Sequence, residues 1–137
     1  MFAMRCKTRM DTARVRRAAK RGSVKSLAHA AALIRKIARR SIRRRKDPAA
    51  ASPAGRPPFT HRRGRGLRDA IRFAVDRYKT RAVVGPAHSV VGAAGAAHEF
   101  GGEYRGDQFD KRPFMGPALD KAAPDLPAFW RHSVKEA

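Results

Sequence analysis

The stretch Ser23–Arg45, SVKSLAHAAALIRKIARRSIRRR, carries the strongest secondary-structure signal in this 137-residue chain. Its apolar residues recur three and four positions apart, which predicts a long helix with one apolar stripe. The stripe consists of Val24, Leu27, Ala31, Ile34, Ala38 and Ile42, widened by Ala30 and Ile37. Ser23 or Ser26 can cap the first turn. Asp47-Pro48 ends the helix, because the residue before a proline is pushed out of the α region.

The remaining surface of this helix is basic, and the cluster at its end continues into the following loop. A dense field of one sign predicts a polyanionic partner or an acidic protein surface. Double-stranded DNA would be bound non-specifically, because the cluster has no Asn or Gln to contact base edges. The residues expected to contact DNA or an acidic partner are Arg35, Arg39, Arg40, Arg43, Arg44, Arg45, Lys46, Arg62, Arg63 and Arg65. A solvated face is the alternative for any charge run.

Net charge divides the chain into two unequal halves. The whole chain carries 32 Lys and Arg against 11 Asp and Glu, a formal charge of +21. Residues 1–72 hold 23 basic and 3 acidic side chains, whereas residues 73–137 hold 9 and 8. The charge of the first half favours a polyanionic partner or an acidic protein surface, and the second half has the balance of an ordinary protein-contact domain.

Two segments lie on either side of the expected helix. Residues 1–22 read as a basic N-terminal arm, either disordered or an extension ahead of a start at Met4 or Met10, although the composition also resembles a transit peptide. Residues 48–66 form a loop rich in Pro, Gly and Arg, and a loop this long often orders on assembly. Cys6 is the only cysteine, so an internal disulfide is excluded, and no apolar run is long enough for a membrane span.

The rest of the chain predicts short strands and helices within a single domain, residues 23–137. Leu67–Ile71 reads as a helical turn, and Ile71–Tyr78 and Ala82–Val84 read as strands joined by a tight connection. Ser89–Gly92 is either a third strand or an edge. Gly92–Phe100 favours a short helix that Gly101-Gly102 ends with positive φ. Residues 103–112 are expected to form a polar hairpin or open loop, and Phe114–Arg131 a C-terminal helix that can break at Pro124 and Pro127.

Three patterns bear on chemistry. Gly92–Gly95 and Gly101-Gly102 lack the spacing of a phosphate cradle, and Glu103, Asp107 and Asp110 lie on a polar loop with no nucleophile nearby. His98-Glu99 matches the start of a zinc-protease signature. The signature needs a second histidine four positions after the first, and that position holds Gly102. The five histidines lie far apart, and no Cys, His or carboxylate group has ligand spacing, so no metal site and no cofactor are expected. We therefore do not expect an enzyme.

The segment Arg112–Pro117, RPFMGP, places two large apolar side chains between prolines. A rigid backbone lets Phe and Met fill a partner's pocket at low entropic cost. The alternative is that Phe114 and Met115 plug the domain's own core, and one of them could face each way. Together with the preceding motifs, the expected protein interface comprises Pro57, Pro58, Phe59, Glu99, Phe100, Gly101, Gly102, Arg112, Pro113, Phe114, Met115 and Pro117.

These motifs together resemble the head–tail junction proteins of tailed bacteriophages, the tail-completion or virion-morphogenesis family. The resemblance covers roughly residues 50–135. It rests, in order, on Ser52-Pro-Ala-Gly-Arg-Pro-Pro-Phe59, Leu67–Phe73, Val84-Gly-Pro86, Ala97-His-Glu-Phe-Gly-Gly102 and Arg112-Pro-Phe-Met-Gly-Pro-Ala-Leu119. The basic N-terminal part departs from the family pattern.

The resemblance implies an α+β domain, with a long N-terminal helix packed on a small, mainly antiparallel sheet and a C-terminal helix. It also implies a structural virion protein made in the host bacterial cytoplasm and placed at the head–tail junction. There it would form a ring, expected to be hexameric, around the DNA channel, in contact with connector, portal-side and tail-tube proteins. A basic nucleic-acid-binding protein of ribosome or nucleoid type is the rival hypothesis, which explains the charge but not the motifs.

Overall fold

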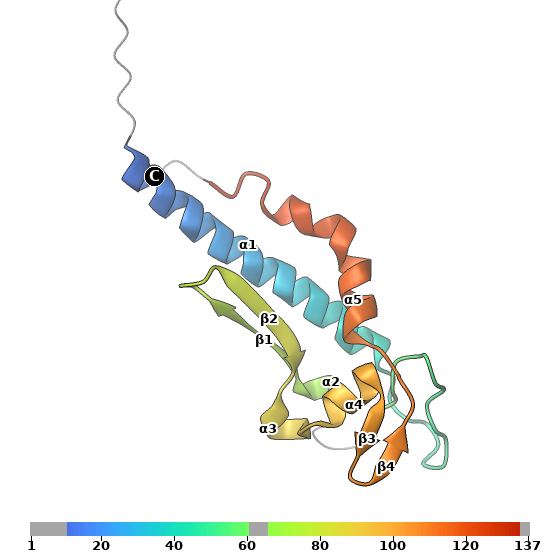
Figure 1. Cartoon of the computed structure of the whole chain (residues 1–137). Coiled ribbons are helices and arrows are strands. Elements are labelled where there is room, and N and C mark those ends of the chain that lie inside the picture. The colour runs from blue at the N-terminus through green and yellow to red at the C-terminus, as the bar shows by residue number, and fades with distance from the viewer. Residues whose placement is uncertain (1–10, 61–65, 135–137) are drawn as a thin grey trace, which may run out of the picture.

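The computed structural model describes residues 11–60 and 66–134. The expected α+β fold is confirmed: one long N-terminal helix, two small antiparallel sheets and a C-terminal helix (Figure 1). The elements are α1 (Thr12–Ser41), α2 (Leu67–Ala70), β1 (Ile71–Asp76), β2 (Arg81–Pro86), α3 (His88–Val91), α4 (Ala94–Phe100), β3 (Gly102–Tyr104), β4 (Asp107–Phe109), α5 (Met115–Ala122) and the 3₁₀ helix η1 (Ala123–Phe129).

Helix α1 is the spine of the molecule, with one layer on each of two sides. The β1–β2 hairpin lies along one side, and α5 with η1 returns along the other, toward the first turns of α1 (Figure 1). The Ser26 hydroxyl donates to the carbonyl of Phe129 at 2.6 Å, and the ring of His29 stacks on that of Phe129. The smaller helices and the β3–β4 hairpin gather near the C-terminal end of α1 (Figure 1).

The core forms where the apolar stripe of α1 meets both layers. Its buried residues are Ala38, Ile42, Leu67, Ile71, Phe114 and Ala118, with Ile34, Ile37, Val84, Val91 and Met115 packed against them. The expected stripe is therefore confirmed in its C-terminal part. Burial of these side chains is the dominant favourable contribution to folding.

The first sheet has the two strands that the sequence predicts. Phe73 of β1 pairs with Val84 of β2, and the hairpin turn falls at residues 77–80. The Asp76 carboxylate closes that turn by accepting from the backbone N–H of Tyr78 and Lys79. Those bonds to the backbone, with Arg81 nearby, hold the pKa of Asp76 below its ordinary value.

The prediction that the long helix begins at Ser23 is wrong, because α1 begins eleven residues earlier. Asp11 caps it, accepting from the backbone N–H of Arg14 at 2.9 Å. The expected arm is thus helical from Thr12 onward, and residues 1–10 lie outside the described residues. Gly22 costs the helix only about 1 kcal/mol relative to alanine, and a Cβ there would overlap the carbonyl of Ser133. The apolar stripe starts later than the helix does, so the stripe predicted a helix that was too short.

The predicted end of that helix, at Arg45, is also wrong. The helix ends at Ser41, whose hydroxyl donates to the carbonyl of Ala38, and Ile42 turns into extended backbone. Ile42 leaves the helix to bury its side chain, which is 1% exposed. The arginines that follow therefore lie on an extended segment rather than in a last helical turn.

The remaining elements match the sequence with one exception. The alternative of a third strand at residues 89–92 is wrong, since His88–Val91 is helical. The short helix before Gly101-Gly102, the positive φ of both glycines, the hairpin at 103–112 and the broken C-terminal helix are confirmed. Among the described residues, no helix combines the length and the apolar character that a membrane span requires.

Candidate interaction surfaces

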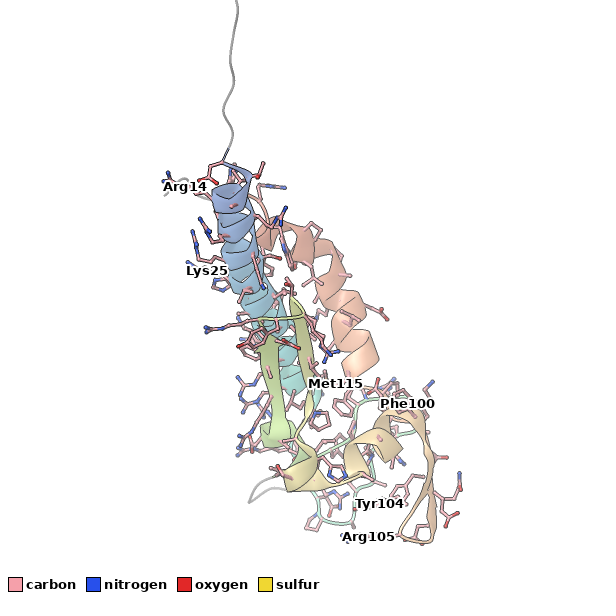
Figure 2. The ribbon with its side chains drawn as sticks, turned by 60° about the vertical axis from the view of Figure 1, so that its left-hand side comes forward. Arg14, Lys25, Phe100, Tyr104, Arg105 and Met115 are labelled. Carbon is pink, nitrogen blue, oxygen red and sulfur yellow. The ribbon has the colours of Figure 1, made fainter. Side chains whose placement is uncertain are left out.

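Helix α1 contains no acidic residue along its whole length. Its basic residues are Arg14, Arg16, Arg17, Lys20, Arg21, Lys25, Arg35, Lys36, Arg39 and Arg40. We call the exposed members of this set the basic face, and Figure 2 labels two of them, Arg14 and Lys25, in the N-terminal half of α1. Like charges four positions apart, such as Arg21 and Lys25, destabilise a helix by about 0.2–0.5 kcal/mol per pair. An anionic partner would remove that cost.

Three of the predicted contact arginines are held by the protein itself. The Nε of Arg35 donates to the carbonyl of Ile71 at 2.9 Å, and Arg39 forms a 2.9 Å ion pair with Asp69. Arg45 donates to the carbonyl of Pro48 at 3.0 Å. These three side chains tie α1 and the segment that follows it to neighbouring elements. Arg62, Arg63 and Arg65 lie outside the described residues.

The other predicted arginines line a groove of about 520 Å³ at the C-terminal end of α1. We call it the arginine groove, and its lining residues are Arg40, Ile42, Arg43, Arg44, Arg45, Lys46 and Arg68. Extended backbone holds it in place: Arg44 forms an isolated parallel bridge with Thr60, through bonds from Thr60 N–H to the Arg43 carbonyl and from Arg45 N–H to the Thr60 carbonyl. The groove is therefore built by two chain segments and α2.

Arg68 is the groove residue that sequence reasoning missed. It follows the buried Leu67 at the start of α2, which brings a sixth cation beside those of residues 40–46. Its Nε is enclosed and has no hydrogen-bond partner among the described residues. The sequence offered one sign of this role: Arg68 lies shortly before the first predicted strand, in a segment whose only acidic residue is Asp69. In the structure, Asp69 forms its ion pair with Arg39.

Two further hollows along α1 are also lined by cations. One, of about 320 Å³, joins Arg17, Lys20 and Arg21 to Arg77 of the β1–β2 turn. The other, of about 450 Å³, lies between α1 and the C-terminal segment and includes Arg21, Lys25 and Arg131. Cations therefore gather in two places along α1, around its first turns and at the arginine groove, with no Lys or Arg on residues 26–34 between them.

The predicted docking motif at residues 98–102 instead makes a clamp with residues 112–116. Glu99 accepts backbone hydrogen bonds from Phe114, Met115 and Gly116 at 2.8, 2.9 and 2.8 Å. Helix α5 has no side-chain cap of its own, and the next residue, Pro117, has no N–H to satisfy. Glu99 thus accepts hydrogen bonds from the free N–H groups at the start of α5, and its negative charge interacts favourably with the positive end of the helix dipole.

Backbone contacts close the clamp on its other side. Arg112 N–H donates to the His98 carbonyl at 2.6 Å, and the Arg112 guanidinium donates to the carbonyl of Ser52 at 2.9 Å. Gly101 has φ 73°, and a Cβ there would lie 3.2 Å from Lys111 N. Burial, with the charge of Arg112, holds the pKa of His98 below its ordinary value. The clamp therefore also fastens the loop around Ser52.

The apolar residues predicted to form an interface divide into buried core residues and exposed surface residues. Phe114 is 1% exposed in the core and Pro58 is fully buried, so neither side chain can reach a partner in this structure. Met115 packs against the core, and Pro57, Phe59 and Pro113 are half-buried. Phe100 is 76% exposed at the end of α4, and Leu119 of α5 is 48% exposed. Figure 2 shows Phe100 and Met115 near one another, on the part of the molecule remote from Arg14.

His98-Glu99 offers no catalytic arrangement. All three hydrogen bonds of the Glu99 carboxylate go to backbone N–H groups, and Nδ1 of His98 is enclosed without a partner among the described residues. Within residues 11–60 and 66–134, no group of three or more His, Cys, Asp or Glu side chains could hold a metal ion.

Comparison with known proteins gives no relative: no protein-family model, no curated protein and no solved structure matches this chain.

Proposed function

We propose that this protein is a structural component of the head–tail connector of a tailed phage or phage-like particle. There it completes or joins the tail and forms part of a ring around the DNA channel. The observation that carries the proposal is the separation of two surfaces on one small domain. The acid-free helix α1 carries one surface, and the exposed Phe100 of α4 and Leu119 of α5 mark the other.

A ring of identical subunits needs two different contact patches, because each copy binds the next head to tail. The exposed Phe100 and Leu119 are large apolar side chains of the kind that anchor such contacts. The basic face is then free to lie toward DNA in the channel or toward an acidic ring of the portal or the tail. The five motifs that resemble the junction family support the same proposal, and that family's hexameric symmetry is the copy number it implies.

Part of the motif evidence has a second explanation in folding. Glu99, Gly101, Arg112 and Phe114 hold the domain together and would be required whatever the protein does. The motifs therefore support a shared fold more directly than a shared interface. Exposed Phe100 has no such explanation, so the assembly proposal depends most on that residue.

Electron microscopy of lysate from a producing strain that lacks this gene tests the proposal. DNA-filled heads beside unattached or misjoined tails are the expected result. Complementation with Phe100→Ser should reproduce the defect, whereas Tyr78→Ser should restore intact particles. Tyr78 is 93% exposed on the β1–β2 turn and serves as the matched control. Intact, infectious particles from the deletion strain would overturn the connector proposal.

The rival function, a nucleic-acid-binding protein of ribosome or nucleoid type, is favoured by one observation, the absence of acids from α1. It predicts that deletion leaves particles intact while the purified protein binds random duplex DNA at nanomolar concentration in physiological salt. DNA binding alone does not separate the two functions, so the particle experiment decides between them.

A further inference from the structure

We propose that the arginine groove binds the phosphodiester backbone of double-stranded nucleic acid. The inference rests on the proposed function for its natural ligand, the DNA of the channel, but the binding itself can be tested on the purified protein. It assigns a ligand to five side chains that the fold leaves available: Arg40, Arg43, Arg44, Lys46 and Arg68.

These five cations have no ion pair with any described residue. The two carboxylates nearest in sequence are already used, since Asp47 accepts from the N–H of Ala49 and Asp69 pairs with Arg39. Among the described residues, no carboxylate forms an ion pair with these five cations. The C-terminal end of α1 carries about half a negative charge, which five cations exceed severalfold.

The groove is pre-formed, which lowers the entropic cost of binding. The bridge between Arg44 and Thr60 fixes the extended segment, and the hydrogen bond from the Arg45 guanidinium to the Pro48 carbonyl holds it further. Buried Ile42 anchors the same segment in the core. The side chains of Arg43 and Arg44 project from a backbone that is already held in position.

The chemistry of the groove favours phosphate over an acidic protein. Guanidinium groups match phosphate oxygens in a bidentate geometry, and four of the five available cations are arginines. A protein interface has an apolar centre, and the only apolar side chain lining this groove is Ile42, which is 1% exposed. The exposed large apolar residues Phe100 and Leu119 lie elsewhere.

The length of the basic surface fits a duplex. Thirty residues of α1 span about 45 Å at 1.5 Å per residue, and one turn of B-DNA spans about 34–36 Å. The hollow lined by Arg17, Lys20 and Arg77 lies toward the start of α1, and the arginine groove lies at its end. From Lys20 to Arg40 the helix rises about 30 Å at 1.5 Å per residue, which is comparable to one turn of the duplex. The arginine groove, which gathers the denser charge, would supply most of the binding.

Fluorescence anisotropy of a 30-base-pair random duplex, titrated with the full-length protein over a range of NaCl concentrations, tests the inference. The groove variant is Arg43→Gln/Arg44→Gln/Arg68→Gln. The matched control is Arg105→Gln/Lys111→Gln/Lys121→Gln, which removes the same charge from exposed positions elsewhere. The groove variant should bind about tenfold or more weakly near physiological salt, with a salt slope smaller by about 2–3, since each phosphate contact contributes about 0.9. The control should stay within about threefold of the wild type.

Equal losses in both variants would overturn the inference, because net charge and not the groove would then set affinity. An unchanged groove variant would also overturn it. If poly-glutamate binds as tightly as DNA at equal charge, and loses affinity in the groove variant alone, the groove is a site for acidic protein and the inference is wrong. Should the triple variant fail to fold by circular dichroism, Arg43→Glu/Arg44→Glu keeps Arg68 and takes its place.

The two proposals can fail separately. Suppose that the groove variant loses DNA affinity but deletion of the gene leaves infectious particles intact. The groove proposal then stands and the connector proposal is wrong. Suppose instead that deletion gives misjoined particles but the groove variant binds DNA normally. The connector proposal then stands and the groove proposal is wrong.

Discussion

The clamp and the arginine groove differ in how they use their charges. In the clamp, one carboxylate meets three backbone donors and one guanidinium meets backbone carbonyls, all within the chain. In the groove, six cations lie together, and no carboxylate among the described residues forms an ion pair with them. Both regions looked like contact surfaces in the sequence.

The difference shows which charged motifs point outward. A motif whose polar groups are satisfied inside the fold is explained by stability, because a buried donor without a partner costs about 1–3 kcal/mol. A cluster that raises self-repulsion is not explained by stability. It needs a reason outside the chain, and the groove is such a cluster. The predictions that follow test this separation.

The largest effect should come from the core residue of the clamp. Phe114→Ala should lower the free energy of unfolding by about 3–5 kcal/mol, because a large buried ring leaves a cavity. Urea denaturation followed by circular dichroism measures it. Phe100→Ala is the control and should stay within about 0.5 kcal/mol of wild type, since that ring is exposed. Comparable losses in both would mean that Phe100 is also part of the core.

Removing the carboxylate of the clamp should come next in size. Glu99→Ala leaves three backbone donors at the start of α5 without an acceptor, and we expect a loss of about 2–3 kcal/mol. Glu99→Gln should lose less, because its amide oxygen still accepts. Glu103→Ala removes an exposed carboxylate of the neighbouring hairpin and should be nearly neutral. Thermal unfolding of the four proteins ranks them, and a neutral Glu99→Ala would show that the clamp does not stabilise the fold.

The fold could be predicted from local signals where those signals are strong. The apolar stripe located the packed part of α1, and the β-branched and aromatic residues located β1 and β2. The start of α1 was missed because residues 12–17 are exposed and carry no apolar stripe, yet they still form a helix. The end was missed because Ile42 fits the helical spacing, yet its side chain reaches the core only after the backbone extends.

The site was only half predictable. The basic cluster was evident, but the split between arginines held by the chain, such as Arg35 and Arg39, and those left free depends on contacts over 30 or more positions. The capping role of Glu99 had one usable sign: α5 begins Phe-Met-Gly-Pro, with no Ser, Thr, Asp or Asn to cap it. A helix without a local cap needs an acceptor from elsewhere, and Glu99 is a carboxylate 15 residues before Phe114.

A third, smaller effect concerns pH. The pKa of His98 is lowered in the folded protein from an ordinary 6.5, so the unfolded chain binds a proton first as pH falls. The contribution to stability is complete above pH 6.5 and declines as pH falls from there through the folded pKa. Urea denaturation across that range should show wild type losing stability relative to His98→Phe, which keeps a ring beside Phe109. If the free energy of unfolding changed with pH in the same way for both proteins, the pH dependence would arise from a group other than His98.

The smallest predicted effect has the opposite sign and concerns the basic face. Lys36→Gln should leave stability unchanged or raise it by a few tenths of a kcal/mol, because Lys36 is exposed and lies four positions from Arg40 on a helix without acids. Added NaCl should stabilise the wild type more than the variant, since salt screens exposed like charges. Differential scanning calorimetry at two salt concentrations measures both shifts. A destabilised Lys36→Gln would mean that this cation has a favourable partner inside the fold, and the basic face would then need no partner outside it.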